Sequence, residues 1–266
     1  MKTSTANLLG ILLFAGLFTR EAGANAIFQL DARKHVAVVE SGTETNLVWQ
    51  TLQGMAVSGD ASEWQDTGDG VKNIAPDPAL VRPLAFKDDT TTNGQYVRSI
   101  VMVVRCTQED GFRVKETLVG GDRNFCLAGL PENLASNNVH AVFEENEIFA
   151  QAASWRVDGV EFAGLEKGKT LLVEVVFEQS MRLPDIVLCG QKGRREWRYG
   201  WGGQLCEAIG LSSELTPDER AGLYHVLRLK WKLSPDIPSA SQAQHSAARS
   251  LGINLGSYVS TLFLIK

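Results

Sequence analysis

The sequence predicts an all-β sandwich, and two observations carry that prediction. Short apolar or alternating segments, separated by Gly, Pro, Asn and Asp, recur along most of the chain. Only one segment, 216–231, carries a full set of helix signals. Many strands with one late helix are typical of a β-sandwich, and 266 residues suit one large β domain.

The expected strands follow in chain order. The segment 97–105, VRSIVMVVR, is almost continuously apolar, which predicts a central strand buried on both faces under a helix or loops. A hairpin is expected over 154–162, because Asp158-Gly159 favours a type I′ turn. Residues 54–80 are rich in Gly, Asp and Ala and are expected to form a loop. The other expected strands are 36–39, 47–52, 112–119, 140–149, 171–177, 186–188 and 205–211.

The helix signals begin at Thr216, a good N-cap. Pro217 suits the first helical position, and Glu219 completes a capping box. An apolar face is expected from residues spaced four apart, namely Leu223, Leu227 and Trp231. His225 is expected on the exposed side of this helix.

The stretch from Gly202 to Trp231 resembles the closing signature of bacterial laminin G-like domains. In that family a G-x-I-x-E strand precedes a short L-[ST]-x-x-E-R helix that ends in L-x-x-K-W. The matching residues are Gly203, Leu205, Glu207, Leu215, Thr216, Glu219, Arg220, Leu227, Lys230 and Trp231. Cys206 and Leu229 depart from the usual pattern. The resemblance covers about 27–233 and implies a concanavalin A-like jelly-roll β-sandwich with one short C-terminal helix.

The N-terminal segment 1–26 is predicted to be a secretory signal peptide. Lys2 precedes an apolar run over 8–18, and two small-x-small sites follow, ending at Ala24 and Ala26. An uncleaved membrane anchor is the alternative, although the run is short for a stable membrane span. Cleavage would leave a mature chain with a net charge of −6, secreted or on the surface of a bacterium. No basic patch suggests nucleic acid as a partner.

Four cysteines in an exported protein suggest disulfides between sequence neighbours, Cys106–Cys126 and Cys189–Cys206. The alternative is four buried free thiols. Residues 234–266 are expected to be a linker or weak helix followed by a C-terminal strand. That strand either completes the sheet or supports self-association through 251–266.

No catalytic constellation is apparent, so the chain is predicted not to be an enzyme and to need no cofactor or metal. Glycosidases of sandwich architecture place carboxylates alternately on one strand. Glu145 and Glu147 share that spacing but lack the central Asp and the apolar alternation. The four histidines are scattered, whereas a metal site would group them.

The segment 192–201 is the ligand-binding candidate, because it combines aromatic faces with cationic donors. Trp197 and Tyr199 could stack on the apolar face of a sugar, and Arg195 and Arg198 could hydrogen-bond its hydroxyl or acidic groups. The alternative is that Trp197 and Trp201 fold back over the edge of the core.

The leading functional hypothesis is therefore non-catalytic binding of a carbohydrate or another cell-surface ligand. The second is a structural adhesion or assembly subunit whose C-terminal strand pairs with a partner. The third, a glycoside hydrolase, ranks below them because the carboxylates are missing.

Overall fold

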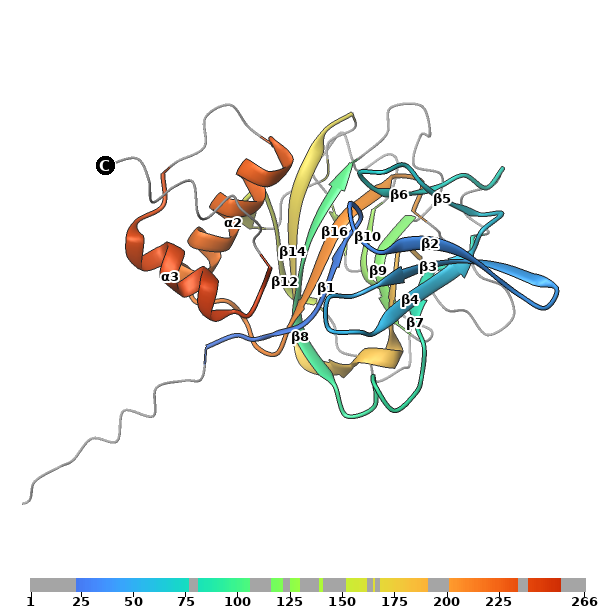
Figure 1. Cartoon of the computed structure of the whole chain (residues 1–266). Coiled ribbons are helices and arrows are strands. Elements are labelled where there is room, and N and C mark those ends of the chain that lie inside the picture. Colours follow the sequence, from blue (N-terminus) through green and yellow to red (C-terminus); the bar gives the residue numbers. More distant parts are fainter. Residues whose placement is uncertain are drawn as a thin grey trace, which may run out of the picture.

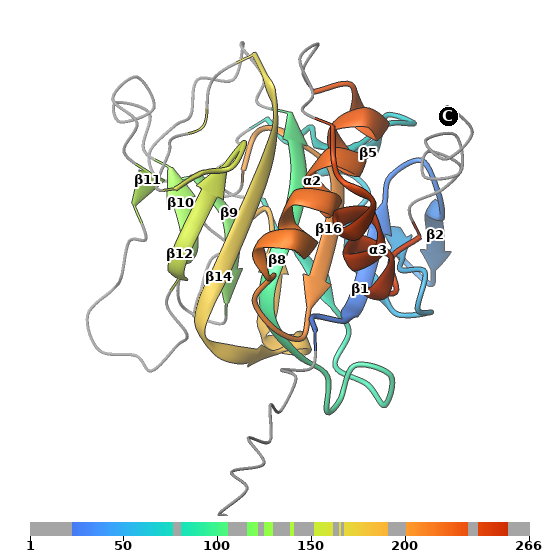
Figure 2. The same ribbon diagram turned by 90° about the vertical axis from the view of Figure 1, so that its left-hand side faces the viewer.

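The computed structural model describes residues 23–76, 81–105, 116–121, 125–129, 139–140, 152–161, 165, 168–190, 201–233 and 239–254. These residues form two antiparallel sheets of eight strands each, with two helices packed outside one sheet (Figures 1 and 2). The predicted all-β sandwich is confirmed at this level.

Sheet A contains the longest strands and carries the helices. Its order is β13 (Val160–Glu161), β12 (Ala152–Val157), β14 (Thr170–Arg182), β8 (Tyr96–Arg105), β16 (Gln204–Leu211), β6 (Val71–Asn73) and β5 (Trp64–Asp66). The N-terminal strand β1 (Ala26–Asp31) also pairs with β16, through residues 207–211.

Sheet B faces sheet A. Its order is β11 (Val139–His140), β10 (Phe125–Gly129), β9 (Glu116–Gly121), β15 (Ile186–Leu188), β7 (Leu84–Phe86), β4 (Ala56–Asp60), β3 (Glu44–Gln50) and β2 (Val36–Ser41). A 3₁₀ turn, η2 (Leu183–Asp185), carries the chain from β14 in sheet A to β15 in sheet B.

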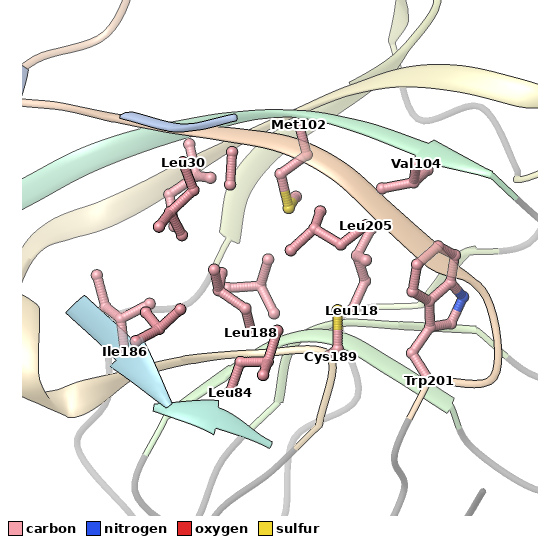
Figure 3. Packing of buried hydrophobic residues seen from close by; sticks show 14 of the residues in the cluster. Leu30, Leu84, Met102, Val104, Leu118, Ile186, Leu188, Cys189, Trp201 and Leu205 are labelled. Atoms are coloured by element: carbon pink, nitrogen blue, oxygen red, sulfur yellow. The ribbon is translucent and has the colours of Figure 1, made fainter. Parts of the chain in front are cut away.

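The main core fills the space between the sheets. Figure 3 shows Leu30, Met102 and Leu205 from sheet A facing Leu84 and Leu188 from sheet B. The largest side chains buried in this core are Trp49, Trp64, Trp201, Phe28 and Phe177. Burial on this scale is what holds two sheets face to face.

A second apolar layer lies on the outer face of sheet A, under α2 (Pro217–Trp231) and α3 (Gln242–Ser250) (Figure 2). Val101 and Val103 of β8 face the helices, whereas Met102 and Val104 face the main core. The prediction that 97–105 is buried on both faces is therefore confirmed, and α2 supplies the outer cover.

Helix α2 begins as predicted. The Thr216 hydroxyl accepts a hydrogen bond from the Glu219 backbone, and the Glu219 carboxylate accepts one from the Thr216 backbone at 2.8 Å. Leu223 and Leu227 are buried, and Trp231 is partly buried. The hairpin over 154–162 is also confirmed, since Asp158 and Gly159 have φ of 52° and 90°, as a type I′ turn requires.

The structure has a second helix in the segment where the sequence predicted either a linker or a weak helix. Ser241 caps α3 with a capping box, and α3 packs directly on α2. The contact is so close that a Cβ at Gly222 would lie 2.0 Å from the Gln244 carbonyl oxygen. The expectation that His225 is exposed was wrong, because α3 covers it and His245 packs edge-on at 5.1 Å between ring centroids.

The loop expected over 54–80 was also wrong for its described part. Residues 56–73 include β4, β5 and β6, whose inward side chains Val57, Trp64 and Val71 are buried. These strands have three to five residues, so the Gly- and Asp-rich turns between them dominate the local composition. Of the expected strands 112–119 and 140–149, residues 112–115 and 141–149 lie outside the described residues.

The described N-terminal residues pack against the domain. Ala24 is buried in the layer under the helices, and the Ala26 amide donates to the Leu251 carbonyl at 2.7 Å. Residues 255–266, with most of the predicted C-terminal strand, lie outside the described residues. No helix in the described part of the chain is long and apolar enough to cross a membrane.

Candidate functional site

The predicted ligand-binding residues Arg195, Trp197, Arg198 and Tyr199 lie outside the described residues, and so do Glu145 and Glu147. The structure describes the chain up to Gly190 and again from Trp201, the last residue of the predicted binding segment. The Trp201 amide donates to the Cys189 carbonyl at 3.2 Å, so the chain leaves and re-enters the sandwich at neighbouring points. Trp201 is buried in the main core next to Cys189 (Figure 3). Trp201 is therefore a core residue.

The predicted Cys189–Cys206 disulfide is absent, because both thiols are free. Cys189 faces the main core from the end of β15, whereas Cys206 faces the helix layer on the opposite side of sheet A. An irregularity in the β16–β8 register between Leu205 and Glu207 turns Cys206 outward. Burial raises the pKa of Cys206 to about 12 and also raises that of Cys189. Cys106 and the side chain of Cys126 lie outside the described residues.

The residues of the C-terminal signature meet in a buried ion cluster beneath the end of α2. The Lys230 ammonium donates to Glu207 Oε2 and Asp31 Oδ2, both at 2.7 Å. The indole of Trp231 donates to the same Glu207 oxygen at 2.6 Å, and Gln29 donates to its other oxygen at 2.7 Å. Burial alone would raise the pKa of Asp31, but Lys230 lowers it below its usual value.

A second ion cluster holds the first half of α2. Glu174 on β14 is fully buried and accepts two hydrogen bonds from Arg220, at 2.7 and 3.1 Å. The Tyr224 hydroxyl donates to the same carboxylate at 2.5 Å. Burial and then the Glu174 charge raise the pKa of Tyr224, so its hydroxyl stays protonated and keeps donating. At the exposed edge of this cluster, Arg220 also forms an ion pair with Glu214 at 3.2 Å.

These two clusters assign a structural role to the signature. In each, a buried carboxylate on a strand of sheet A meets a cation and a hydroxyl or indole donor from α2. Buried charges are tolerated only when paired and hydrogen-bonded in this way. The polar atoms therefore serve to seat α2 on the sheet, and they explain the motif without a ligand.

A polar groove lies elsewhere, where the chain crosses from β4 in sheet B to β5 in sheet A. It has a volume of about 560 Å³, within the range of about 300–1,000 Å³ that small-molecule sites occupy. Its walls are the start of β3, the β4–β5 turn and one arginine: Thr43, Glu44, Thr45, Asn46, Asp60, Ala61, Ser62 and Arg82. Sequence reasoning missed it, because only the fold brings its walls together: residues 60–62 lie in the expected loop 54–80, and the other lining residues come from outside that segment.

The backbone of the groove is fixed by its surroundings. Gly59 has no side chain, so the Trp64 indole can lie against the backbone there, where a Cβ would come within 2.5 Å of it. The Trp64 indole nitrogen then donates to the Arg82 carbonyl at 2.8 Å. The Arg82 amide donates to the Glu63 carboxylate at 3.0 Å. Arg82 is thus held on both sides while its side chain stays exposed.

The β4–β5 turn forms another wall. Asp60 Oδ1 accepts hydrogen bonds from the Ser62 amide at 2.9 Å and the Ser62 hydroxyl at 2.7 Å. These bonds lower the pKa of Asp60, with a smaller contribution from the Arg82 charge. The Ala61 amide donates to the Thr45 carbonyl at 3.0 Å and ties the turn to β3. Asp60 therefore presents an ionised carboxylate at neutral pH.

The groove offers acceptors and donors side by side. Glu44 and Asp60 supply carboxylates, Arg82 a guanidinium and Asn46 an amide. Three hydroxyl groups, from Thr43, Thr45 and Ser62, complete the lining. Such a lining can hydrogen-bond a molecule rich in hydroxyl groups. Among the described residues, those of the groove included, no three His, Cys, Asp or Glu side chains gather as metal ligands would.

No family model, no curated protein and no solved structure matches this chain.

Proposed function

We propose that the protein is an exported, non-catalytic carbohydrate-binding protein whose β-sandwich is a laminin G-like, concanavalin A-type jelly roll. The polar groove at the β4–β5 turn is the observation that carries the binding proposal. The signature residues that seat α2 on sheet A, together with two antiparallel sheets, support the family assignment.

The groove fits a saccharide better than an apolar ligand. Carboxylate, amide and guanidinium groups can each bridge neighbouring hydroxyls with two hydrogen bonds. Its lining includes no aromatic or large aliphatic side chain. Its affinity must therefore come from hydrogen bonds, whose net contribution is modest, about 0.5–1.5 kcal/mol each. Weak binding per site is the expected result.

A glycan array on the mature protein, followed by titration of any glycan that binds, tests the proposal. Replacing Glu44 and Arg82 together, as Glu44→Gln with Arg82→Ala, removes one negative and one positive charge from the groove. Because both side chains are exposed, the melting temperature should stay unchanged while binding is lost. Glu161→Gln on the β12–β13 hairpin is the matched control and should bind normally.

The predicted loop residues provide a second arm of the same experiment. If Trp197→Ala abolishes binding and the groove variant does not, the ligand sits on the 192–201 segment. Loss of stability in Trp197→Ala with unchanged binding would assign that tryptophan to packing. A glycan array without any bound glycan overturns the proposal, and hydrolysis of a bound glycan overturns the non-catalytic assignment.

Export is part of the proposal, and the structure favours one cleavage site. Cleavage after Ala24 keeps the bond from the Ala26 amide to Leu251 and the bond from Ser212 to the Asn25 carbonyl. Cleavage after Ala26 would remove both. The mature chain should therefore begin at Asn25, and intact mass of the exported protein decides the question. A mass that includes residues 1–18 would show that the apolar segment is retained.

A further inference from the structure

The strand β2 is the outer strand of sheet B (Figures 1 and 2), and it is exposed from residue 37 to residue 41, whereas Val36 is partly buried against the main core. Within the described part of the chain, β2 pairs with β3 alone, through six successive residue pairs from Val36–Trp49 to Ser41–Glu44. The register has no bulge. The edge away from β3 therefore presents a straight row of backbone donors and acceptors.

Two neighbouring valines of β2 are unusually exposed. Val38 is 61% exposed and Val39 is 44% exposed, and as adjacent strand residues they point to opposite faces. Val38 is paired with Leu47, which is fully buried, so both side chains point toward the core side of sheet B. The core covers Leu47 but ends before Val38. Beyond Val36, the strand therefore has exposed apolar groups on both faces.

Proteins usually protect such an edge from pairing with another chain. The common devices are proline, an inward or edge lysine, a bulge, or a very short strand. The sequence of β2, VAVVES, has six residues and contains neither proline nor lysine. An exposed apolar edge of this kind is a template for adding a strand.

From these features we infer that β2 is the interface through which two copies of this chain form a symmetric dimer. In an antiparallel pair, the start of one β2 meets the end of the other. The strand is preceded by Lys34 and His35 and ends near Glu40, so the basic end of each copy meets the acidic end of its partner. This charge pattern favours self-pairing over pairing with a strand of unrelated charge.

We expect the antiparallel pairing to be centred on Ala37. This register places Val36 of each copy opposite Val38 of the other, and directly opposed residues lie on the same face of the sheet. The same register brings Lys34 close to Glu40. The two copies of sheet B then form one continuous sheet, and Val38 gains the apolar contact that its own sandwich does not provide.

Light scattering of the mature protein tests the dimer directly. We expect the mass of two chains for the wild type and of one chain for Val38→Lys. The matched control is Val160→Lys, because Val160 is 62% exposed on β13, at the outer strand of the other sheet. That variant should keep the mass of two chains. Circular dichroism should show that all three proteins are folded.

Charge reversal tests the register. Lys34→Glu should weaken the dimer, and adding Glu40→Lys to it should restore dimerisation. A monomeric wild type, or a Val38→Lys protein that remains a dimer, overturns the inference. Deleting residues 255–266 should leave the dimer intact. If that deletion alone gives monomers, association runs through the C-terminal segment and β2 is not the interface.

Discussion

Replacing Lys230 is the sharpest test of the claim that the signature residues of α2 serve to hold this helix on sheet A. Its ammonium lies 2.7 Å from both Asp31 and Glu207, and the three side chains are 5%, 4% and 1% exposed. Lys230→Met keeps the length and apolar stem of the side chain but removes its charge. Two buried carboxylates then lose their shared cation.

The expected cost follows from this geometry. Breaking a buried ion pair by removing one partner typically costs about 3–5 kcal/mol. With an m-value of about 3 kcal/mol/M, the urea midpoint at pH 7 should fall by about 1–1.7 M. The matched control is Asp88→Asn, which breaks the exposed Arg182–Asp88 pair and should cost less than about 1 kcal/mol. Equal midpoints for Lys230→Met and the control would refute the reasoning.

The pH dependence gives an independent check. In the wild type the pKa of Asp31 is lowered, so its contribution to stability is present above the usual carboxyl pKa and is lost as the pH falls below it. Without Lys230, burial dominates and raises the pKa of Asp31 in the folded state. The variant should therefore gain stability relative to wild type as the pH falls from 7 toward 4. A constant difference between the two proteins would show that the carboxylates are not buried together.

Other variants and measurements test the packing. Gly222→Ala should destabilise the protein by about 1–3 kcal/mol, because its Cβ would overlap the Gln244 carbonyl; a gain in stability, as expected for alanine in an exposed helix, would contradict this contact. Thr216→Ala should lower the free energy of unfolding by about 1 kcal/mol through loss of the capping box, and an unchanged urea midpoint would show that the cap adds nothing. Peptide mapping after air oxidation should find Cys189 and Cys206 as free thiols, and both should react with Ellman's reagent only after unfolding. A peptide in which the two cysteines are linked would refute the burial of Cys206 behind sheet A.

Local sequence patterns were sufficient where a structure depends on neighbours along the chain. The capping box at Thr216, the Asp158-Gly159 turn and the doubly buried strand 97–105 all appear as predicted. In each case the signal is a backbone geometry or a periodicity contained within a few residues. The short strands β4 to β6 were missed because Gly- and Asp-rich turns outnumber their few apolar residues.

Helix α3 shows the limit of such patterns. Its sequence, QAQHSAARS, has few apolar residues, and its stability depends on packing against α2 at Gly222. His225 was assigned to solvent for the same reason, since no local signal shows that a helix seventeen residues further on will cover it. A burial prediction made from one helix cannot include the element that packs on it.

The sequence by itself determined the all-β class, the start of α2 and the residues of its signature, because these depend on local propensity and periodicity. Only the tertiary structure decided what those residues do. Lys230 and Glu207 are 23 positions apart, and Lys230 and Asp31 are 199 apart, so only the pairing of β1 with β16 under α2 brings the three charges together. The same holds for the cysteines, because Cys189 faces the main core whereas Cys206 faces the helices on the outer side of sheet A. It also holds for the groove, whose walls come from β3, a turn and Arg82.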